Sequence, residues 1–187
     1  IVAKTITPLS PANTGGAIPA DAYGVSTFAG STGSSGTFSA PYGLRSDGSG
    51  SLYVSDASQR IMKVTPDGIL TVIAGSKDVA GNKNGQGSAA LFNNPGQIAT
   101  DLQGNIYVAD INNNEIRKIT PAGQVTTYAG TGAAGSKNGS AATATFFHPT
   151  GVAVDAGGNV YVADHDNGII RKIAADGTVS TFAGLAG

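Results

Sequence analysis

The chain has 187 residues, a formal net charge of −1 and no cysteine. Without cysteine it has neither a disulfide framework nor a thiolate metal site. Without a basic stripe it lacks the electrostatic footprint of a protein that binds nucleic acid. No run of the sequence approaches the roughly 18 apolar residues of a membrane-spanning helix. We therefore expect no nucleic-acid partner and no membrane span.

Glycine is frequent in this sequence and charge is sparse. The chain holds 28 glycines, and Asp, Glu, Lys and Arg together make up 12% of it, against roughly 25% in an ordinary globular domain. This composition favours β structure with many tight turns. Low charge with abundant Gly, Ser, Thr, Ala and Asn is also typical of secreted bacterial surface proteins, so we expect an extracellular or cell-surface location.

The first segment in chain order, residues 1–24, differs from the rest of the sequence. It contains Pro8, Pro11 and Pro19, which suits an arm or linker. A second interpretation stays open, because residues 1–8 loosely match a strand of the repeats that follow, so the segment could be the remnant of a preceding repeat. Residues 25–30 read VSTFAG and predict one extra strand.

Three similar segments follow at a constant period. They begin at Pro41, Pro95 and Pro149, so the spacing is 95 − 41 = 54 and 149 − 95 = 54. Asp56, Asp110 and Asp164 have the same spacing. A fixed period of this length indicates a solenoid, a propeller or an array of repeats.

Within one period the apolar residues alternate over short runs, which predicts strands. In the third copy we expect strands at 151–154, 159–163, 169–173 and 178–183, separated by turns rich in Asp, Asn and Gly. No segment of the chain predicts a helix. Each period therefore predicts a small four-stranded antiparallel sheet.

The P-x-G-[VIL] opening, the YVAD or YVSD strand and the I-R-K-I strand resemble NHL repeats over residues 25–184. The resemblance implies an all-β fold, a β-propeller with NHL-type four-stranded antiparallel blades. Three full blades fall at about 41–75, 95–130 and 149–184, within a propeller segment of 25–187 that includes the extra N-terminal strand. A solenoid is the alternative, but hairpin-linked strands fit a radial blade better.

Three blades cannot close a ring, because known propellers use about four to eight. We expect the two end blades to expose apolar faces. The chain is therefore predicted either to be part of a longer chain or to form a homo-oligomer, for which two copies would supply six blades.

Strand alternation separates the connections onto two faces, and the long connections at about 31–40, 76–94 and 131–148 share one of them. Binding residues usually concentrate on such loops, and amide side chains suit a glycan or protein ligand. The candidate ligand-binding residues are Lys83, Asn112, Asn113, Asn114, Lys137, His148, His165, Asp166 and Asn167. The alternative is that the Asn, Asp and Gly residues only build the turns.

Several residues recur in every copy, and repetition at one blade position argues for architecture. Asp56, Asp110 and Asp164 are expected to cap turns, because Glu115 and Pro121 stand where a calcium loop needs Gly and Glu. The basic residues of the third strands are expected to pack their aliphatic stems while their charges reach water; they are Lys63, Arg117, Lys118, Arg171 and Lys172. Aromatic residues are expected to pack between blades; they are Phe38, Phe92, Phe146, Tyr53, Tyr107 and Tyr161. Pro41, Pro95 and Pro149 mark the blade starts.

Catalysis needs a convergent set of unlike groups, whereas a repeat protein places like groups in like places. His148 and His165 are among the few residues that do not recur, and a catalytic zinc site usually takes three protein ligands. No G-x-S-x-G nucleophile motif is present. We predict a binding or assembly scaffold with no catalytic residues, metal or cofactor. The alternative, implied by the resemblance, is a metal-dependent propeller lyase or hydrolase with a site in the central channel.

Overall fold

A computed structural model describes residues 37–185. The predicted N-terminal segment 1–24 and the extra strand at 25–30 lie outside the described residues. The first blade contains β1 (Pro41–Ser46), β2 (Leu52–Asp56), β3 (Arg60–Val64) and β4 (Leu70–Gly75). The second contains β5 (Gly85–Gln86), β6 (Pro95–Thr100), β7 (Ile106–Asp110), β8 (Glu115–Ile119) and β9 (Gln124–Ala129). The third contains β10 (Gly139–Ser140), β11 (Pro149–Val154), β12 (Val160–Asp164), β13 (Ile169–Ile173) and β14 (Thr178–Ala183).

The strands form three antiparallel sheets. Their orders are β1-β2-β3-β4, β5-β9-β8-β7-β6 and β10-β14-β13-β12-β11. Each sheet is a meander of four hairpin-linked strands, and this confirms the all-β fold and the prediction of propeller blades. The blade starts at Pro41, Pro95 and Pro149 also coincide with the first residues of β1, β6 and β11.

Two features were not expected from the sequence. The connections between blades add the short strands β5 and β10 to the outer edges of the second and third sheets, with Gly85 opposite Val125 and Gly139 opposite Val179. Residues 37–185 also contain three 3-10 helices, η1 (Gly87–Ala89), η2 (Ile111–Asn113) and η3 (His165–Asn167), where no helix was predicted. These turns are only three residues long, too short to show a helical period in the sequence.

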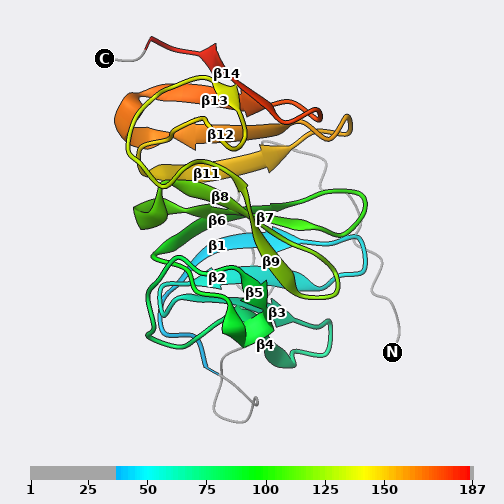
Figure 1. The fold of residues 1–187 in the computed structure, drawn as a ribbon. Helices are drawn as coiled ribbons and strands as arrows, with labels where there is room; N and C mark the ends of the chain where they lie inside the picture. Colours follow the sequence, from blue (N-terminus) through cyan, green and yellow to red (C-terminus); the bar gives the residue numbers. More distant parts are fainter. Residues whose placement is uncertain (1–36, 186–187) are drawn as a thin grey trace, which may run out of the picture.

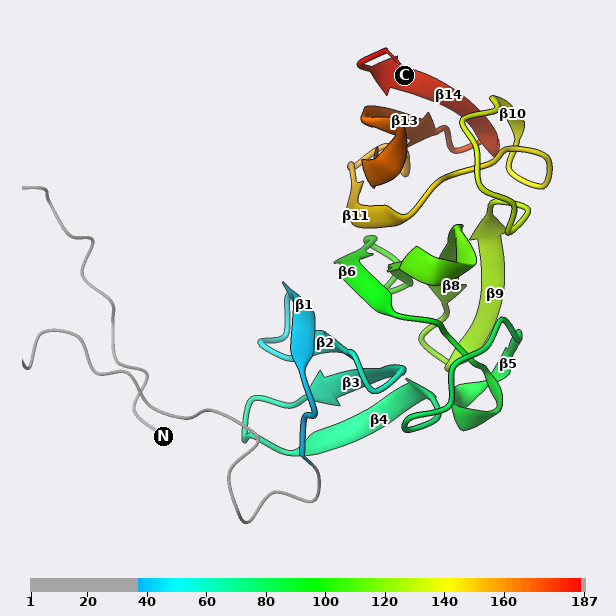
Figure 2. The same cartoon turned by 90° about the vertical axis from the view of Figure 1, so that its left-hand side faces the viewer.

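The three blades fan out around a common region. Figure 2 shows β1, β6 and β11 on the inner side of the arc and β4, β9 and β14 on the outer side. In Figure 1 the blades are stacked, with the 3-10 turns η2 and η3 at the left and the short hairpin turns at the right. We call the first end the loop face and the second the turn face. This separation of connections agrees with the expected strand alternation.

The first and second blades each bury one sheet face against the blade that follows. We call the face toward the preceding blade the leading face and the face toward the following blade the trailing face. Ile61 and Ala74 of the first trailing face share a cluster with Phe92 and Val125 of the second blade. Phe92 and Phe146 are fully buried, so their predicted role in packing between blades is confirmed.

Glycine near the start of each blade lets adjacent inner strands approach closely. A Cβ atom on Gly43 would lie 2.7 Å from the carbonyl oxygen of Gly96. One on Gly96 would lie 2.8 Å from the carbonyl oxygen of Thr150. Gly43, the glycine of the P-x-G opening, and Gly96, which directly follows Pro95, are therefore both required by contact between blades.

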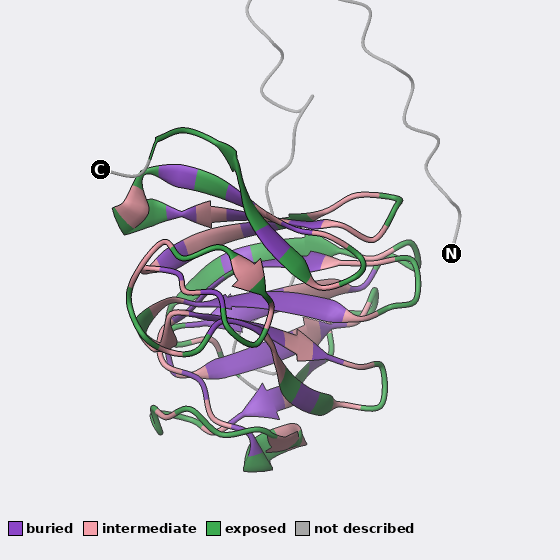
Figure 3. Cartoon of the chain, turned by 45° about the horizontal axis from the view of Figure 1, so that its top comes forward, coloured by how far each residue is buried: buried purple, intermediate pink, exposed green. Residues whose placement is uncertain are grey.

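The two end blades differ, although two open faces were expected. On the leading face of the first blade the middle strands are covered, and Val54, Met62 and Val64 are at most 4% exposed. Leu44 at its inner edge is 64% exposed. On the trailing face of the third blade, Phe182 is 61% exposed. Figure 3 shows the third blade's strands coloured largely as half-buried or exposed, so the widely open face is the trailing one.

Among residues 37–185 there is no helix with the length and hydropathy needed to span a membrane.

Candidate functional site

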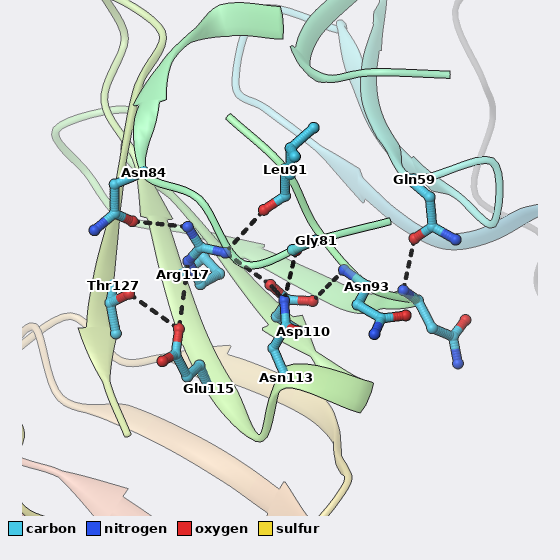
Figure 4. A network of polar contacts seen from close by, with 11 residues as sticks. Gln59, Gly81, Asn84, Leu91, Asn93, Asp110, Asn113, Glu115, Arg117 and Thr127 are labelled. Carbon is cyan, nitrogen blue, oxygen red and sulfur yellow. Dashed lines mark hydrogen bonds and ion pairs between the residues drawn. The ribbon is translucent and has the colours of Figure 1, made fainter. Parts of the chain in front are cut away.

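A buried ion pair supports the loop face in the second blade (Figure 4). The carboxylate of Asp110 accepts hydrogen bonds from the Asn93 backbone N–H, from Asn113 Nδ2 and from Arg117, each at 2.8 Å. Asp110 and Arg117 are both fully buried. The aspartate thus ties the start of the blade, the 3-10 turn and the third strand together.

The third blade repeats this arrangement. Asp164 accepts from the Phe147 backbone N–H at 2.7 Å, from Asn167 Nδ2 at 2.8 Å and from Arg171 at 3.0 Å. Neither Asp110 nor Asp164 caps its 3-10 turn through the side chain. The predicted capping role was therefore wrong. Each carboxylate instead accepts one hydrogen bond from an asparagine side chain of the turn and the others from residues more distant in sequence.

The repeated arginines also differ from expectation. Arg117 donates to the Leu91 carbonyl at 3.1 Å and to Asn84 Oδ1 at 2.7 Å, and its guanidinium lies 5.3 Å from the Phe92 ring centroid. Its charge is buried and paired. The prediction that these charges reach water was wrong for the arginines. The half-buried Lys118 keeps its ammonium 5.6 Å from the ring centroid of Tyr107.

The first blade also contains a buried ion pair, but different residues form it. Met62 occupies the register position of Arg117, since each lies opposite a valine of the second strand. Arg60 occupies the register position of Glu115, and its guanidinium lies 2.6 Å from Asp56. The ion pair is therefore kept while its cation moves by two residues along the strand. Sequence alignment alone does not reveal this compensation.

The equivalent aspartates of the second and first blades, Asp110 and Asp56, differ in pKa because their surroundings differ. Burial raises the pKa of Asp110 to about 6, against the opposing effect of hydrogen bonds from Asn93 and Asn113 and of Arg117. Burial also acts on Asp56, but the backbone hydrogen bonds from Ala40 and Ser39, with those from Ser58 and Arg60, outweigh it and lower its pKa to about 2.

A hydrogen bond joins each blade to the next at the loop face, and we call it the clasp. Gln59 Oε1 accepts from the backbone N–H of Asn94 at 2.7 Å, as Figure 4 shows. Asn114 Oδ1 accepts from the backbone N–H of His148 at 2.9 Å. Gln59 and Asn114 both have left-handed backbone, with φ of 69° and 53°. The equivalent residue of the third blade is Gly168, which has no side chain for a clasp.

Two histidines share one carboxylate on the loop face of the third blade. Nδ1 of His148 and Nδ1 of His165 each lie 2.5 Å from a different oxygen of Asp166. These hydrogen bonds lower the pKa of Asp166. The His148 side chain is 40% exposed and that of His165 is 67% exposed. The structure thus brings together three of the residues predicted to bind ligand.

The other predicted residues divide into two groups. Asn113, Asn114 and Asn167 use their side chains within the fold, donating to the carbonyls of Gly81, Gly132 and Gly135. Lys83, Asn112 and Lys137 are exposed. Over residues 37–185 no group of three or more His, Asp or Glu side chains is placed to hold a metal ion.

Comparison with known proteins gives one family match. Residues 146–173 match the model of the NHL repeat. The chain is 37% identical over 94 residues to Protein SUPPRESSOR OF QUENCHING 1, chloroplastic, from Arabidopsis thaliana, covering 50% of this chain and 9% of that protein. It is 32% identical over 161 residues to NHL repeat-containing protein 2 from Bos taurus, covering 78% of this chain and 22% of that protein. The chain therefore spans less than a quarter of either relative.

Solved structures share the blade arrangement. An auxiliary nutrient binding protein from Bacteroides thetaiotaomicron matches with a TM-score of 0.65 and 24% identity, covering 75% of this chain and 37% of that chain. A gluconolactonase from Xanthomonas campestris matches with a TM-score of 0.57 and 14% identity, covering 78% and 48%. At these identities the likeness shows the fold alone, which is that of β-propeller blades.

Proposed function

Because this chain belongs to the NHL-repeat family of β-propeller proteins, we propose that it is a non-enzymatic binding and assembly scaffold. The loop face presents polar side chains to a protein or glycan ligand. The trailing face of the third blade mediates self-association. The nutrient-binding relative of this fold and the glycine-rich, weakly charged composition support an extracellular or cell-surface location for this role.

The open trailing face of the third blade is the observation that carries the proposal. Ile116 of the second blade is fully buried, whereas its counterpart Ile170 is 38% exposed. Tyr161 and Phe182 form the same edge-to-face aromatic pair as Tyr107 and Tyr128, with ring centroids 5.1 Å and 4.9 Å apart. The trailing face of the third blade thus has the same kind of residues that the second blade uses to contact the third, but no blade of residues 37–185 covers it.

A shallow hollow marks the same face near the loop end. It has a volume of about 260 Å³, and Ala163, Ile170 and Ala183 contribute to its lining. Burial of a Phe or Ile side chain stabilises an interface by roughly 1.5–3 kcal/mol. The middle of the first leading face is already buried, so the proposed partner is the trailing face of a second copy, paired about a two-fold axis.

Self-association predicts a dimer that depends on Phe182. We expect the wild-type chain to show twice the monomer mass at high concentration in light scattering and sedimentation, and Phe182→Ser to shift the equilibrium toward monomer. Ile69→Ser is the matched control, because Ile69 is 48% exposed but lies in a hairpin turn of the first blade. A folded wild-type monomer at all concentrations would contradict the proposal, as would equal effects of both variants.

The proposed ligand surface on the loop face is centred on the cluster of His148, His165 and Asp166. Because each Nδ1 is engaged by Asp166, the imidazoles are oriented by their carboxylate partner. Exposed Asn112 adds an amide donor and acceptor. Such groups hydrogen-bond equally well to glycan hydroxyls and to peptide backbone.

Ligand binding is tested with His165→Ala, which removes the most exposed ring of the cluster. We expect at least one glycan retained by the wild-type chain on an array, or one protein partner captured from the culture medium and identified, to bind at least about tenfold more weakly to this variant. Lys172→Ala, on the trailing face, is the control and should bind normally. Equal binding by wild type and His165→Ala would remove the loop face from the proposal.

A further inference from the structure

The turn face contains a cavity, at the opposite end of the blades from the proposed ligand surface. It has a volume of about 600 Å³, within the usual range for small-molecule sites. Its walls are the first hairpin turns of all three blades, residues 45–49, 100–102, 104 and 154–156, together with Tyr53. The cavity therefore lies where the inner strands of the blades end.

The turn aspartates of the second and third blades are saturated by hydrogen bonds. Asp101 Oδ1 accepts from the backbone N–H groups of Gln103 and Asn105, and Oδ2 accepts from Asn105 Nδ2 at 2.7 Å and from the Tyr107 hydroxyl at 3.2 Å. Asp155 Oδ2 is held in the same way by Asn159 and Tyr161. In these two blades the hairpin leaves no carboxylate oxygen for a ligand.

The first blade departs from this pattern at the wall of the cavity. Ser51 stands where Asn105 stands in the second blade, so the Asn donor to the second oxygen is missing. Asp47 Oδ1 accepts from Ser49 N at 2.8 Å, Ser49 Oγ at 2.7 Å and Ser51 N at 3.0 Å. Asp47 Oδ2 and the Tyr53 hydroxyl make no hydrogen bond with any residue of the described range 37–185. A free acceptor and a free hydroxyl thus face the same space.

A cation occupies the same wall, again only in the first blade. Arg45 replaces the alanines Ala99 and Ala153 of the other blades and lies opposite Tyr53 in the strand register. Its Nε lies 3.5 Å from Thr100 Oγ1. No carboxylate within residues 37–185 comes within ion-pair distance of its guanidinium, so the terminal nitrogen atoms are open to a ligand.

We propose that this cavity binds a neutral saccharide. Vicinal hydroxyls can donate to the free oxygen of Asp47 and accept from the Arg45 guanidinium at the same time, because each hydroxyl is both donor and acceptor. Leu102, which is 85% exposed and lines the cavity, supplies an apolar contact for the C–H groups of a sugar ring. This site is separate from the loop face and does not depend on its ligand.

The site is tested with two variants that restore the residue found at the same position of the other blades. Such residues are compatible with the fold of a blade. Arg45→Ala introduces the residue found at Ala99 and Ala153, and Ser51→Asn introduces the residue found at Asn105 and Asn159. Ligand-observed NMR and calorimetry with glucose, galactose, maltose and cellobiose are expected to identify at least one bound sugar. Each variant is expected to weaken that binding at least about tenfold.

His165→Ala, on the loop face, is the control and should leave the affinity for the sugar unchanged, which also keeps this test independent of the proposed ligand surface. Circular dichroism of Arg45→Ala and Ser51→Asn checks that both variants fold, and we expect spectra like that of the wild-type chain. The proposal is overturned if none of the four sugars binds or if the two restoring variants retain wild-type affinity. Binding of the free amino acids glycine or alanine in place of the sugars would also overturn it.

Discussion

Replacement of Arg117 by methionine is expected to lower the free energy of unfolding by about 3–5 kcal/mol, the range for breaking a buried ion pair by removing one partner. The change leaves the Asp110 carboxylate buried without its cation and leaves Asn84 and the Leu91 carbonyl without their donor. Chemical denaturation followed by circular dichroism measures the loss. Lys118→Met on the same strand is the control, with an expected loss below about 1 kcal/mol.

The first blade suggests how to rescue this variant. Methionine is tolerated at position 62 because Arg60 supplies the cation to Asp56. The double variant Glu115→Arg with Arg117→Met places the same pair of residues in the second blade, at the same register. We expect it to recover a substantial part of the lost stability. A double variant as unstable as Arg117→Met would show that the two arrangements are not equivalent.

Substitution of Gly96 by alanine is expected to destabilise the fold by about 1–3 kcal/mol, the usual penalty for overpacking. The new methyl group would lie 2.8 Å from the Thr150 carbonyl oxygen and about as close to the Ile111 side chain, at 3.0 Å. The backbone oxygen cannot rotate away, so the inner strands of the second and third blades must separate. Thermal and urea unfolding report this change.

Gly151→Ala is the control, because Gly151 also lies near the start of an inner strand but no following blade packs against it within residues 37–185. Thr150, and not a glycine, holds the place of Gly96 in the third blade. Its nearest neighbours are the Ala163 Cβ at 3.3 Å and a flexible Gln97 side-chain oxygen at 3.4 Å. We expect a smaller loss of stability than for Gly96→Ala. If both variants lose the same amount, backbone entropy and not contact between blades explains the glycine.

The period of the sequence was sufficient to predict the sheets, because a strand with alternating apolar residues has few other ways to bury one side. The boundaries of the third and fourth strands of the last blade were predicted correctly at 169–173 and 178–183. The strands β5 and β10 were missed. Each is two residues long, and its pairing depends on how the preceding loop passes the outer edge of the blade.

The polar network was harder to predict, since its partners lie far apart in the sequence. The sequence does not reveal the partners of Asp110 and Asp164, because Asn93 and Phe147 precede them by 17 residues. Sequence spacing does not show that Arg60 takes the role of Arg117 in the first blade. The turn between the second and third strands is one residue shorter there. Alignment by spacing therefore places Arg60 beside the wrong residue.

The cluster of His148, His165 and Asp166 could be suspected from sequence because these residues do not recur. Their contact could not, since it requires His148 to adopt a left-handed backbone with φ of 46° at the start of the blade. The turn-face cavity was not expected at all. Its signal was present in Arg45 and Ser51, two departures from the repeat on the face with the shorter connections.

The clasp has a consequence for mechanical strength along the arc of blades. Gln59 and Asn114 fasten the two internal junctions through side-chain hydrogen bonds, each contributing roughly 0.5–1.5 kcal/mol. Gly168 offers no such bond to whatever lies beyond the third blade. Force or heat should therefore first break the contact that a partner makes with the trailing face of the third blade. Association at that face is then reversible while the three blades stay folded.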